Sequence, residues 1–254
     1  MDSLGDRMKQ YYEDAYRLYL PRRMPVVIRV DGRAFHTFTR GFKKPFDVFF
    51  QGIMSLTTKE LCNAVEGVKM AYTQSDEISL LLTNDDNVDT QAWFDNNLQK
   101  LVSLSASIAT LAFNKYYYEE LYHDFEDDIE LYINGIFKAQ FDSRVFILPK
   151  EEVANYFIWR QQDAVRNSVQ MVAQSLYSHK ELLGKNCNQL QEMIFQKGVN
   201  WNDYETRYKR GLCYIKKPVQ TGEVTRNKFV ADLDIPIFTE NKEYIENLFV
   251  KKNN

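Results

Sequence analysis

Apolar and polar residues follow one another along this chain in blocks that predict strands and helices. The run Pro25–Val30 is almost wholly apolar and predicts a first strand. Residues 68–83 predict a hairpin of two further strands, with the polar group 75–77 between them. Phe141–Leu148 predicts a fourth strand, which ends at Pro149 because proline has no backbone N–H to donate to a sheet.

Four longer segments have the apolar spacing of helices: residues 2–20, 47–67, 93–118 and 151–178. In the second of these, Asp47 can cap a helix that carries Phe49, Ile53 and Leu56 on one face. We expect Trp159, in the fourth, to lie in the core. The rest of the chain, from about residue 180, predicts short helices and two strands, at Gly211–Ile215 and Phe229–Phe238.

The order strand, helix, strand, strand, helix, strand is that of the split βαβ arrangement. We therefore predict an α+β fold: a palm-like βαββαβ antiparallel sheet of ferredoxin or RRM type, with helices on one face and a C-terminal extension. The expected division gives a palm-like domain with an N-terminal helix in residues 1–180. Residues 181–254 form the extension, with helices and short strands packed on the palm.

Carboxylates lie at two strand ends of this predicted sheet. Asp31 closes the first strand and is followed by Gly32, while Asp76 and Glu77 stand in the hairpin turn. Acidic residues are rare inside strands, so they mark either an exposed turn or a site. The first and third strands are neighbours in this topology, which brings Asp31 and Asp76 to one edge. Two carboxylates there could hold a divalent cation, and the Gly32 carbonyl could approach it because glycine has no side chain.

Composition narrows the kind of site. The 254 residues are 44% hydrophobic, which is enough for a sizeable core, and carry a formal net charge of −3. The three cysteines and three histidines lack zinc-site spacing, so we expect a hard ion on carboxylates, magnesium above all. No apolar run reaches membrane-spanning length and no signal peptide is apparent, so we expect a cytoplasmic protein without a membrane partner. The acidic block Asp124–Glu130 is expected to be an exposed connection.

Several motifs resemble those of the tRNA(His) guanylyltransferase superfamily, whose members add nucleotides in the 3′-to-5′ direction to tRNA 5′ ends. The similarity covers roughly residues 5–217, and its motifs occur in the same order. They are Arg29-Val30-Asp31-Gly32-Arg33-Ala34-Phe35-His36, Phe42-Lys43-Lys44-Pro45-Phe46-Asp47, Ala71-Tyr72-Thr73-Gln74-Ser75-Asp76-Glu77, residues 141–149, Trp159-Arg160-Gln161-Gln162-Asp163 and Tyr208-Lys209-Arg210-Gly211.

The resemblance implies a palm-like catalytic domain with two magnesium ions held by Asp31, the Gly32 carbonyl and Asp76. The implied catalytic residues are Asp31, Asp76 and Glu77. ATP or GTP would activate the tRNA, and nucleoside triphosphates would be the substrates of addition. The implied nucleotide-binding residues are Asp31, Gly32, Arg33, Ala34, Phe35, His36, Lys44, Ser75 and Asp76. Residues implied to contact tRNA or substrate are Arg29, Asp47, Lys100, Arg144, Arg160, Asp163, Arg166, Asn167, Lys209 and Arg210. The family also implies a homotetramer, a dimer of dimers.

One departure bears on specificity. Where the eukaryotic branch carries His-Ile-Asn-Asn, this chain has Val165-Arg166-Asn167-Ser168, which resembles the bacterial and archaeal guanylyltransferase-like proteins. That branch implies template-dependent repair of 5′-truncated tRNA. The alternative is addition of a single G to tRNA(His). Two other classes stay open: a palm cyclase that makes cyclic nucleotides, and a noncatalytic RRM-like RNA-binding module. The apolar first strand, without aromatic residues, argues against the last.

Overall fold

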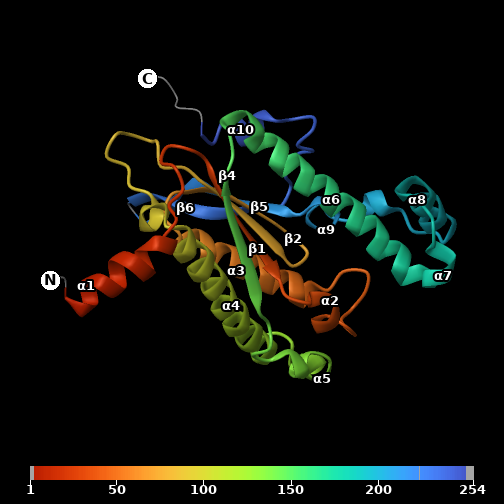
Figure 1. The fold of residues 1–254 in the computed structure, drawn as a ribbon. Coiled ribbons are helices and arrows are strands. Elements are labelled where there is room, and N and C mark those ends of the chain that lie inside the picture. The colour runs from red at the N-terminus through yellow and green to blue at the C-terminus, as the bar shows by residue number, and fades with distance from the viewer. Residues whose placement is uncertain (1–2, 223, 250–254) are drawn as a thin grey trace.

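The computed structural model describes residues 3–222 and 224–249, and within these ranges six strands form one antiparallel sheet (Figure 1). The strand order is β4-β1-β3-β2-β5-β6. Its first four strands have the order that two interleaved βαβ units produce, which confirms the predicted fold class. The strands are β1 (Val26–Gly32), β2 (Val68–Gln74), β3 (Glu77–Leu82), β4 (Phe141–Ile147), β5 (Leu212–Thr221) and β6 (Val224–Asp232).

Two long helices cover one face of the sheet, as predicted for the βαββαβ unit. These are α3 (Val48–Ala64), which begins at the predicted Asp47 cap, and α4 (Leu98–His123). α4 contacts β1 and β4, α3 contacts β2, and buried side chains of both helices share one core with Val26, Ile28 and Val30. The core on this side is largely aromatic, because Phe35, Phe49, Phe113 and other rings meet between the helices and the sheet.

The prediction that helices lie on one face is confirmed for the βαββαβ unit, and a helix that follows this unit covers the other face. A third long helix, α6 (Lys150–Leu176), packs on the opposite face, where Phe157 contacts Tyr72 of β2 (Figure 1). The physical reason lies in the strands: all six residues of β3 are buried, and Leu80, Leu81 and Leu82 are consecutive. Such a run has apolar side chains on both faces, so both faces need a cover.

The C-terminal segment continues the same sheet. β5 pairs with β2 through Thr73 and Leu212, and β6 pairs with β5 along its whole length. Both strands start or extend beyond the predicted limits, because they pair with each other past the edge of β2. Ile235, Phe238 and Ile245 then join the core beneath α6. The domain boundary at residue 180 stays a prediction, and residues 1, 2, 223 and 250–254 of the expected domains lie outside the described ranges.

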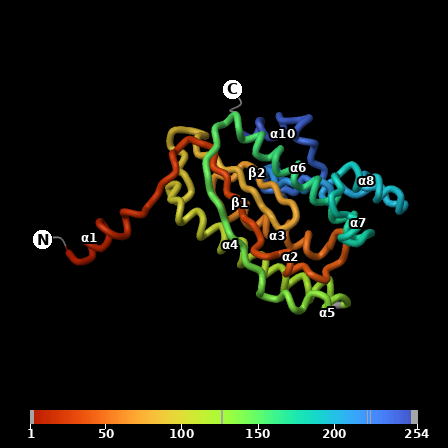
Figure 2. The backbone as a smooth tube through the Cα atoms, turned by 45° about the vertical axis from the view of Figure 1, so that its right-hand side comes forward, coloured from red at the N-terminus to blue at the C-terminus, as the bar shows by residue number. Residues whose placement is uncertain are grey.

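The remaining elements are short. The N-terminal segment is one helical turn followed by a π-helical and a 3₁₀ turn, and it projects from the body of the protein (Figure 2). No described helix is long and apolar enough to cross a membrane. The short helices are α1 (Leu4–Met8), α2 (Phe35–Phe38), α5 (Ile129–Tyr132), α7 (His179–Leu182), α8 (Cys187–Gln196), α9 (Thr206–Arg210) and α10 (Glu243–Glu246), with non-α turns at Lys9–Glu13, Asp14–Tyr16, Trp93–Asn96, Glu126–Asp128, Ile133–Gly135 and Trp201–Asp203.

Candidate functional site

The two carboxylate segments lie side by side at one end of the sheet. Asp31, near the end of β1, is directly opposite Glu77 of β3. The Gly32 amide donates a hydrogen bond of 3.0 Å to the Asp76 carbonyl, which ties the strand end to the hairpin turn. Ser75 adopts a left-handed conformation in that turn, with φ of 50°, and its hydroxyl donates to Asp76 at 3.0 Å. The topology therefore brings Asp31 and Asp76 together, as the strand order predicts.

Charged residues form two rows across the sheet on the face covered by α6. Asp142, Asp31 and Glu77 are opposite one another on β4, β1 and β3. Two residues away along each strand, and so on the same face, Arg144 is opposite Arg29. Side chains that are directly opposite in antiparallel strands point to the same face and interact. The row of carboxylates is therefore flanked by a row of guanidinium groups.

Glu77 is buried, with 4% of its surface exposed, and both of its oxygens are engaged. Arg160 of α6 donates two hydrogen bonds to it, at 2.7 and 2.6 Å, and Arg29 lies 2.9 Å away. Burial raises the pKa of Glu77, while the charges of Arg160 and Arg29 oppose that rise. Two guanidinium partners hold Glu77 as a carboxylate, and this pairing fixes the end of β3 beside Asp31. Glu77 thus supports the neighbouring carboxylates.

The residues present fit a hard divalent ion. Burial raises the pKa of Asp76, and the Asp31 carboxylate adds to this rise, so positive charge at the site would favour both ionised groups. A side chain at Gly32 would collide with the Phe35 ring, because its Cβ would lie only 2.4 Å from that ring. This position therefore favours glycine. No group of three or more acidic, His or Cys side chains suited to a metal occurs among the described residues. Magnesium needs fewer, since it commonly takes one or two carboxylates plus substrate phosphates.

A pocket of about 560 Å³ opens beside these carboxylates, between the loop before α3 and helices α6 and α9. It brings together the predicted residues Gly32, His36, Lys44, Ser75 and Asp76 with Asn167 of α6. Ala34 lines it in a left-handed conformation, with φ of 56°, which turns the chain from β1 into α2. A volume of this size is in the range of small-molecule sites.

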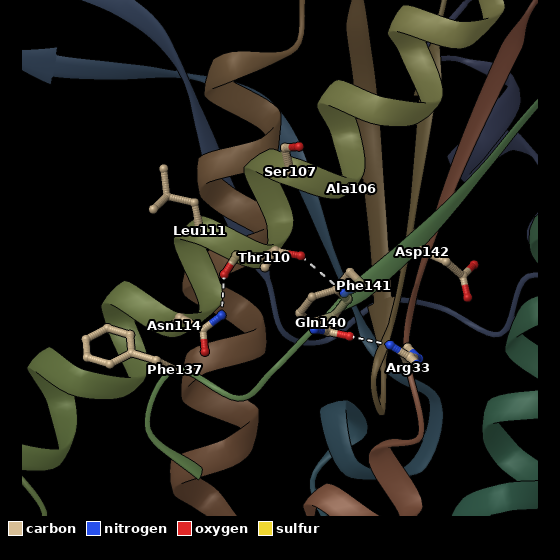
Figure 3. Close-up of a pocket in the computed structure, with 10 residues that line it drawn as sticks. All are labelled: Arg33, Ala106, Ser107, Thr110, Leu111, Asn114, Phe137, Gln140, Phe141 and Asp142. Carbon is tan, nitrogen blue, oxygen red and sulfur yellow. Dashed lines mark hydrogen bonds between the residues drawn. The ribbon is translucent and has the colours of Figure 1, made fainter.

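Some predicted binding residues do other work. Phe35 is buried in the aromatic core, and Arg33 points into a separate hollow between α4 and β4, where it donates to Gln140 at 2.6 Å (Figure 3). Asp47 lines the pocket, but its carboxylate caps α3 by accepting a hydrogen bond from the Phe50 amide. It also accepts from the Lys43 amide and the Tyr132 hydroxyl. These roles depend on partners distant in sequence.

The residues predicted to contact tRNA divide in the same way. Lys100 stands in the first turn of α4, near the segment that leads into β1, whereas Asp31 is at the other end of that strand. Lys209 donates to the Asn202 carbonyl at 2.6 Å, and the Nε of Arg210 is buried without a hydrogen-bond partner among the described residues. Arg29 pairs with both Glu77 and Asp31, and Arg160 pairs with both Glu77 and Asp163.

Near the carboxylates, Asp163 and its neighbours form a second ion-pair group on α6. Burial would raise the pKa of Asp163, but hydrogen bonds and charge from Arg166 and Arg160 lower it. Asn167 also donates to Asp163, at 3.4 Å. Arg144 is half-exposed on β4 and pairs with two carboxylates, Asp142 at 3.3 Å and Asp31 at 3.5 Å.

Several residues of the pocket were not among the predicted site residues, and one predicted core residue is exposed. Phe46 and Tyr208 stack at 5.0 Å between ring centroids and line the pocket, together with Met171 and Gln174 of α6. Positions 164, 167, 168, 171 and 174 recur at helical spacing, which is the signal that could have found this face of α6. Trp159, expected in the core, is 50% exposed.

Comparison with known proteins identifies the family. The sequence model of the Thg1 family, described as tRNAHis guanylyltransferase, matches residues 5–149. A probable tRNA(His) guanylyltransferase of Dictyostelium discoideum is 28% identical over 86% of this chain and 88% of its own length. A solved bacterial tRNA(His) guanylyltransferase (Thg1)-like protein in complex with ATP is 45% identical, with a TM-score of 0.84, over 98% of this chain and 100% of that chain.

A second structure, of the bacterial Thg1-like protein in complex with GTP, has a TM-score of 0.81 at 43% identity over 98% of this chain and 100% of that chain. The Saccharomyces cerevisiae tRNA(His) guanylyltransferase shares the fold, with a TM-score of 0.67 over 92% of this chain and 100% of that one. Because the family model spans more than half of the 254 residues, the chain belongs to the tRNA(His) guanylyltransferase family and is a nucleotidyltransferase.

Proposed function

We propose that this protein adds nucleotides in the 3′-to-5′ direction to the 5′ end of truncated tRNA, using the opposite strand of the acceptor stem as template. The observation that carries the proposal is the junction of Asp31 and Asp76 with a pocket lined by His36, Lys44 and Ser75. The bacterial relatives were solved with ATP and with GTP, which supports a nucleoside triphosphate in this pocket.

The reaction has two phosphoryl transfers. The tRNA 5′-monophosphate attacks the α-phosphate of ATP or GTP, which forms a 5′-nucleotidylylated end and releases pyrophosphate. The 3′-hydroxyl of an incoming nucleoside triphosphate then attacks the activated 5′-phosphate, and the nucleoside monophosphate leaves. Each step forms one phosphorus–oxygen bond and breaks another, without oxidation or reduction.

The chain's own residues position these groups. Asp31, Asp76 and the Gly32 carbonyl would hold two magnesium ions, which neutralise charge on the phosphates when bound. Lys44 adds a cation inside the pocket, where a triphosphate needs one. The Glu77 pairs with Arg29 and Arg160 keep the strand end rigid, so that Asp31 does not have to be ordered when substrate binds.

Two specificities within this activity are distinguishable. Arg166-Asn167-Ser168 and the 45% identity to a bacterial Thg1-like protein favour repair. The curated relatives named tRNA(His) guanylyltransferase, at 28% identity in Dictyostelium discoideum, favour addition of one G to tRNA(His). We give preference to repair because the nearer similarity is to the Thg1-like protein. An RRM-like module would need an open sheet face, but α3 and α4 cover one face and α6 packs on the other.

The partners that we propose are tRNA, nucleoside triphosphates and further copies of this chain in a homotetramer. Exposed apolar side chains on the N-terminal turns support self-association. A cytoplasmic location remains our prediction, which the free thiols of Cys62, Cys187 and Cys213 favour.

The test is incorporation of labelled nucleotide into a tRNA lacking its first nucleotide, with magnesium and ATP. Asp76→Ala should reduce incorporation at least about 10³-fold, since it removes a group that acts on the reacting phosphates. The control Asp89→Ala changes an exposed loop carboxylate and should leave the rate unchanged. Undiminished incorporation by Asp76→Ala would remove the carboxylate assignment. Extension with only G, and only on tRNA(His), would select the narrower activity.

A further inference from the structure

Trp159 presents an exposed indole next to the row of carboxylates. The reaction described above gives this indole no role. Half of its surface is exposed, and an indole offers a large flat ring on which an aromatic ligand can stack. The residue sits on α6 directly before Arg160, the partner of Glu77. An exposed Trp this close to a charged site therefore calls for a ligand.

The ring is held firmly by its own chain. The guanidinium of Arg160 lies over the indole, 4.5 Å from the ring centroid, and Tyr156 contacts it edge-on at 6.0 Å. Arg160 cannot move away, because Glu77 and Asp163 both bind it. Since Arg160 is buried and covers one face of the indole, the exposed half of Trp159 is its other face. The result is a rigid, flat surface open to solvent.

Helix geometry shows which flank of α6 carries this surface. Tyr156 points at the sheet, where it contacts Ser79 of β3 and Phe146 of β4. Successive residues turn by about 100° around a helix, so Phe157, which contacts Tyr72 of β2, is to one side and Trp159 is about 60° to the other. Trp159 therefore faces the β4 side of the sheet.

On that side lie the two rows of charge. Asp31 and Asp142 are opposite each other, and Arg144, with 55% of its side chain exposed, is two residues along β4 from Asp142 on the same face. Arg166, seven residues after Trp159 on the same flank of α6, is equally exposed. The carboxylates thus have the nucleotide pocket on one flank of α6 and an open, partly cationic surface beneath an indole on the other.

We propose that Trp159 stacks on the base of the 5′-terminal nucleotide of the RNA, and that Arg144 contacts the phosphate of that nucleotide. This inference rests on the proposed function, because the reaction needs two phosphate-bearing reactants that meet at Asp31 and Asp76 from different directions. The pocket with His36 and Lys44 encloses one of them, a mononucleotide. The other is part of a polymer and needs an open surface, which only a stacked terminal base and a phosphate would touch.

Trp159→Ala, Trp159→Phe and the control Phe195→Ala test this proposal. Phe195 is an exposed ring on α8, so the control removes the same kind of side chain elsewhere. The probe is a tRNA lacking its first nucleotide, titrated without nucleotide, and ATP binding is measured separately by calorimetry. We expect Trp159→Ala to weaken tRNA binding about tenfold, since stacking on an aromatic ring contributes on the order of 1–3 kcal/mol per base. Its affinity for ATP should be unchanged, and Trp159→Phe should retain most of the tRNA affinity.

Intrinsic fluorescence gives a readout that a merely structural role would not change. Truncated tRNA should quench the tryptophan emission of the wild type and of Trp201→Phe, but not that of Trp159→Phe. Wild-type tRNA affinity in Trp159→Ala would overturn the proposal, as would a loss of ATP affinity in place of tRNA affinity. If the wild type extends truncated tRNA while Trp159→Ala binds it equally well, only this inference fails. If the wild type neither binds nor extends tRNA, the proposed function fails with it.

Discussion

At the scale of single residues, the ionised carboxylate of Asp76 is destabilised by its burial at the site. Burial raises the pKa of this group above its ordinary value, so its ionised form is less stable in the folded chain than in water. A carboxyl group with a raised pKa stabilises the fold below its unfolded pKa and loses that contribution as pH rises through the folded pKa. At neutral pH the charge therefore destabilises the protein until a cation neutralises it.

We therefore predict that Asp76→Asn is more stable than the wild type in EDTA at pH 7.5. The melting temperature should rise by about 1–3 °C, the size expected for a gain under about 1 kcal/mol in a chain of this length. The difference should vanish below about pH 4, where Asp76 is protonated in both states. Thermal unfolding followed by circular dichroism measures both effects. A lower melting temperature for Asp76→Asn at pH 7.5 would contradict it.

The residues that sequence could identify are those whose backbone position fixes their role. Asp31 and Asp76 follow from strand order alone, because any sheet with this topology places them together. The pairing of Arg160 with Glu77 did not follow, and neither did the Tyr132 hydroxyl that donates to the Asp47 cap, since these partners are distant in sequence and only packing brings them into contact. The sequence alone does not distinguish an arginine that pairs with a buried carboxylate from one that binds substrate.

At the scale of elements, the turn from β1 into α2 links the site to the core. Gly32 ends β1, and its Cα faces the ring of Phe35 so closely that a Cβ would be 2.4 Å from it. Phe35 cannot retreat, because Phe38, Phe50, Phe113 and Phe141 surround it. The strand end that carries Asp31 is thus seated directly on the aromatic core.

We predict that Gly32→Ala loses about 1–3 kcal/mol of unfolding free energy, the usual cost of overpacking a core, and weakens ATP binding at the same time. Phe35→Leu in the same chain should recover part of the stability, because the smaller side chain makes room for the methyl group. Urea unfolding and calorimetric titration with ATP measure the two effects. Gly52→Ala, in open space on α3, is the control and should not lower stability. Equal stability of Gly32→Ala and the wild type would refute the close contact.

The elements themselves were predicted well where local pattern decides them. The four strands of the palm and helices α3, α4 and α6 appear where periodicity and capping place them. What the pattern did not supply was the side of the sheet on which α6 packs. The consecutive leucines of β3 indicate that both faces of the sheet are covered. They do not say which helix covers the second face. β5 was predicted too short and β6 was predicted at Phe229–Phe238, whereas it spans Val224–Asp232, since strands that pair beyond a sheet edge carry little apolar pattern there.

At the scale of the whole molecule, the N-terminal turns are the part that its own fold leaves without cover. Residues 4–16 include no buried residue, and Leu4, Tyr11, Tyr12 and Tyr16 are each more than half exposed. Three acidic and two basic side chains accompany them in residues 3–16, so the segment has no positive charge to attract RNA. Exposed apolar rings without net positive charge favour contact with protein.

We therefore predict that deleting residues 1–16 lowers the assembly state while leaving the folded protomer and its ATP affinity intact. The cut removes no core side chain, and it spares Leu18 and Leu20, whose backbones hydrogen-bond to the start of α4. Light scattering after size exclusion gives the mass, and calorimetry gives ATP binding. Tyr122→Ser, which changes an exposed ring on α4, should keep the full assembly. An unchanged mass after the deletion would show that other surfaces join the copies, and a monomeric full-length chain would exclude the tetramer altogether. Loss of mass with retained ATP binding would separate assembly from nucleotide binding, as the distance in sequence between the tyrosines and the pocket suggests.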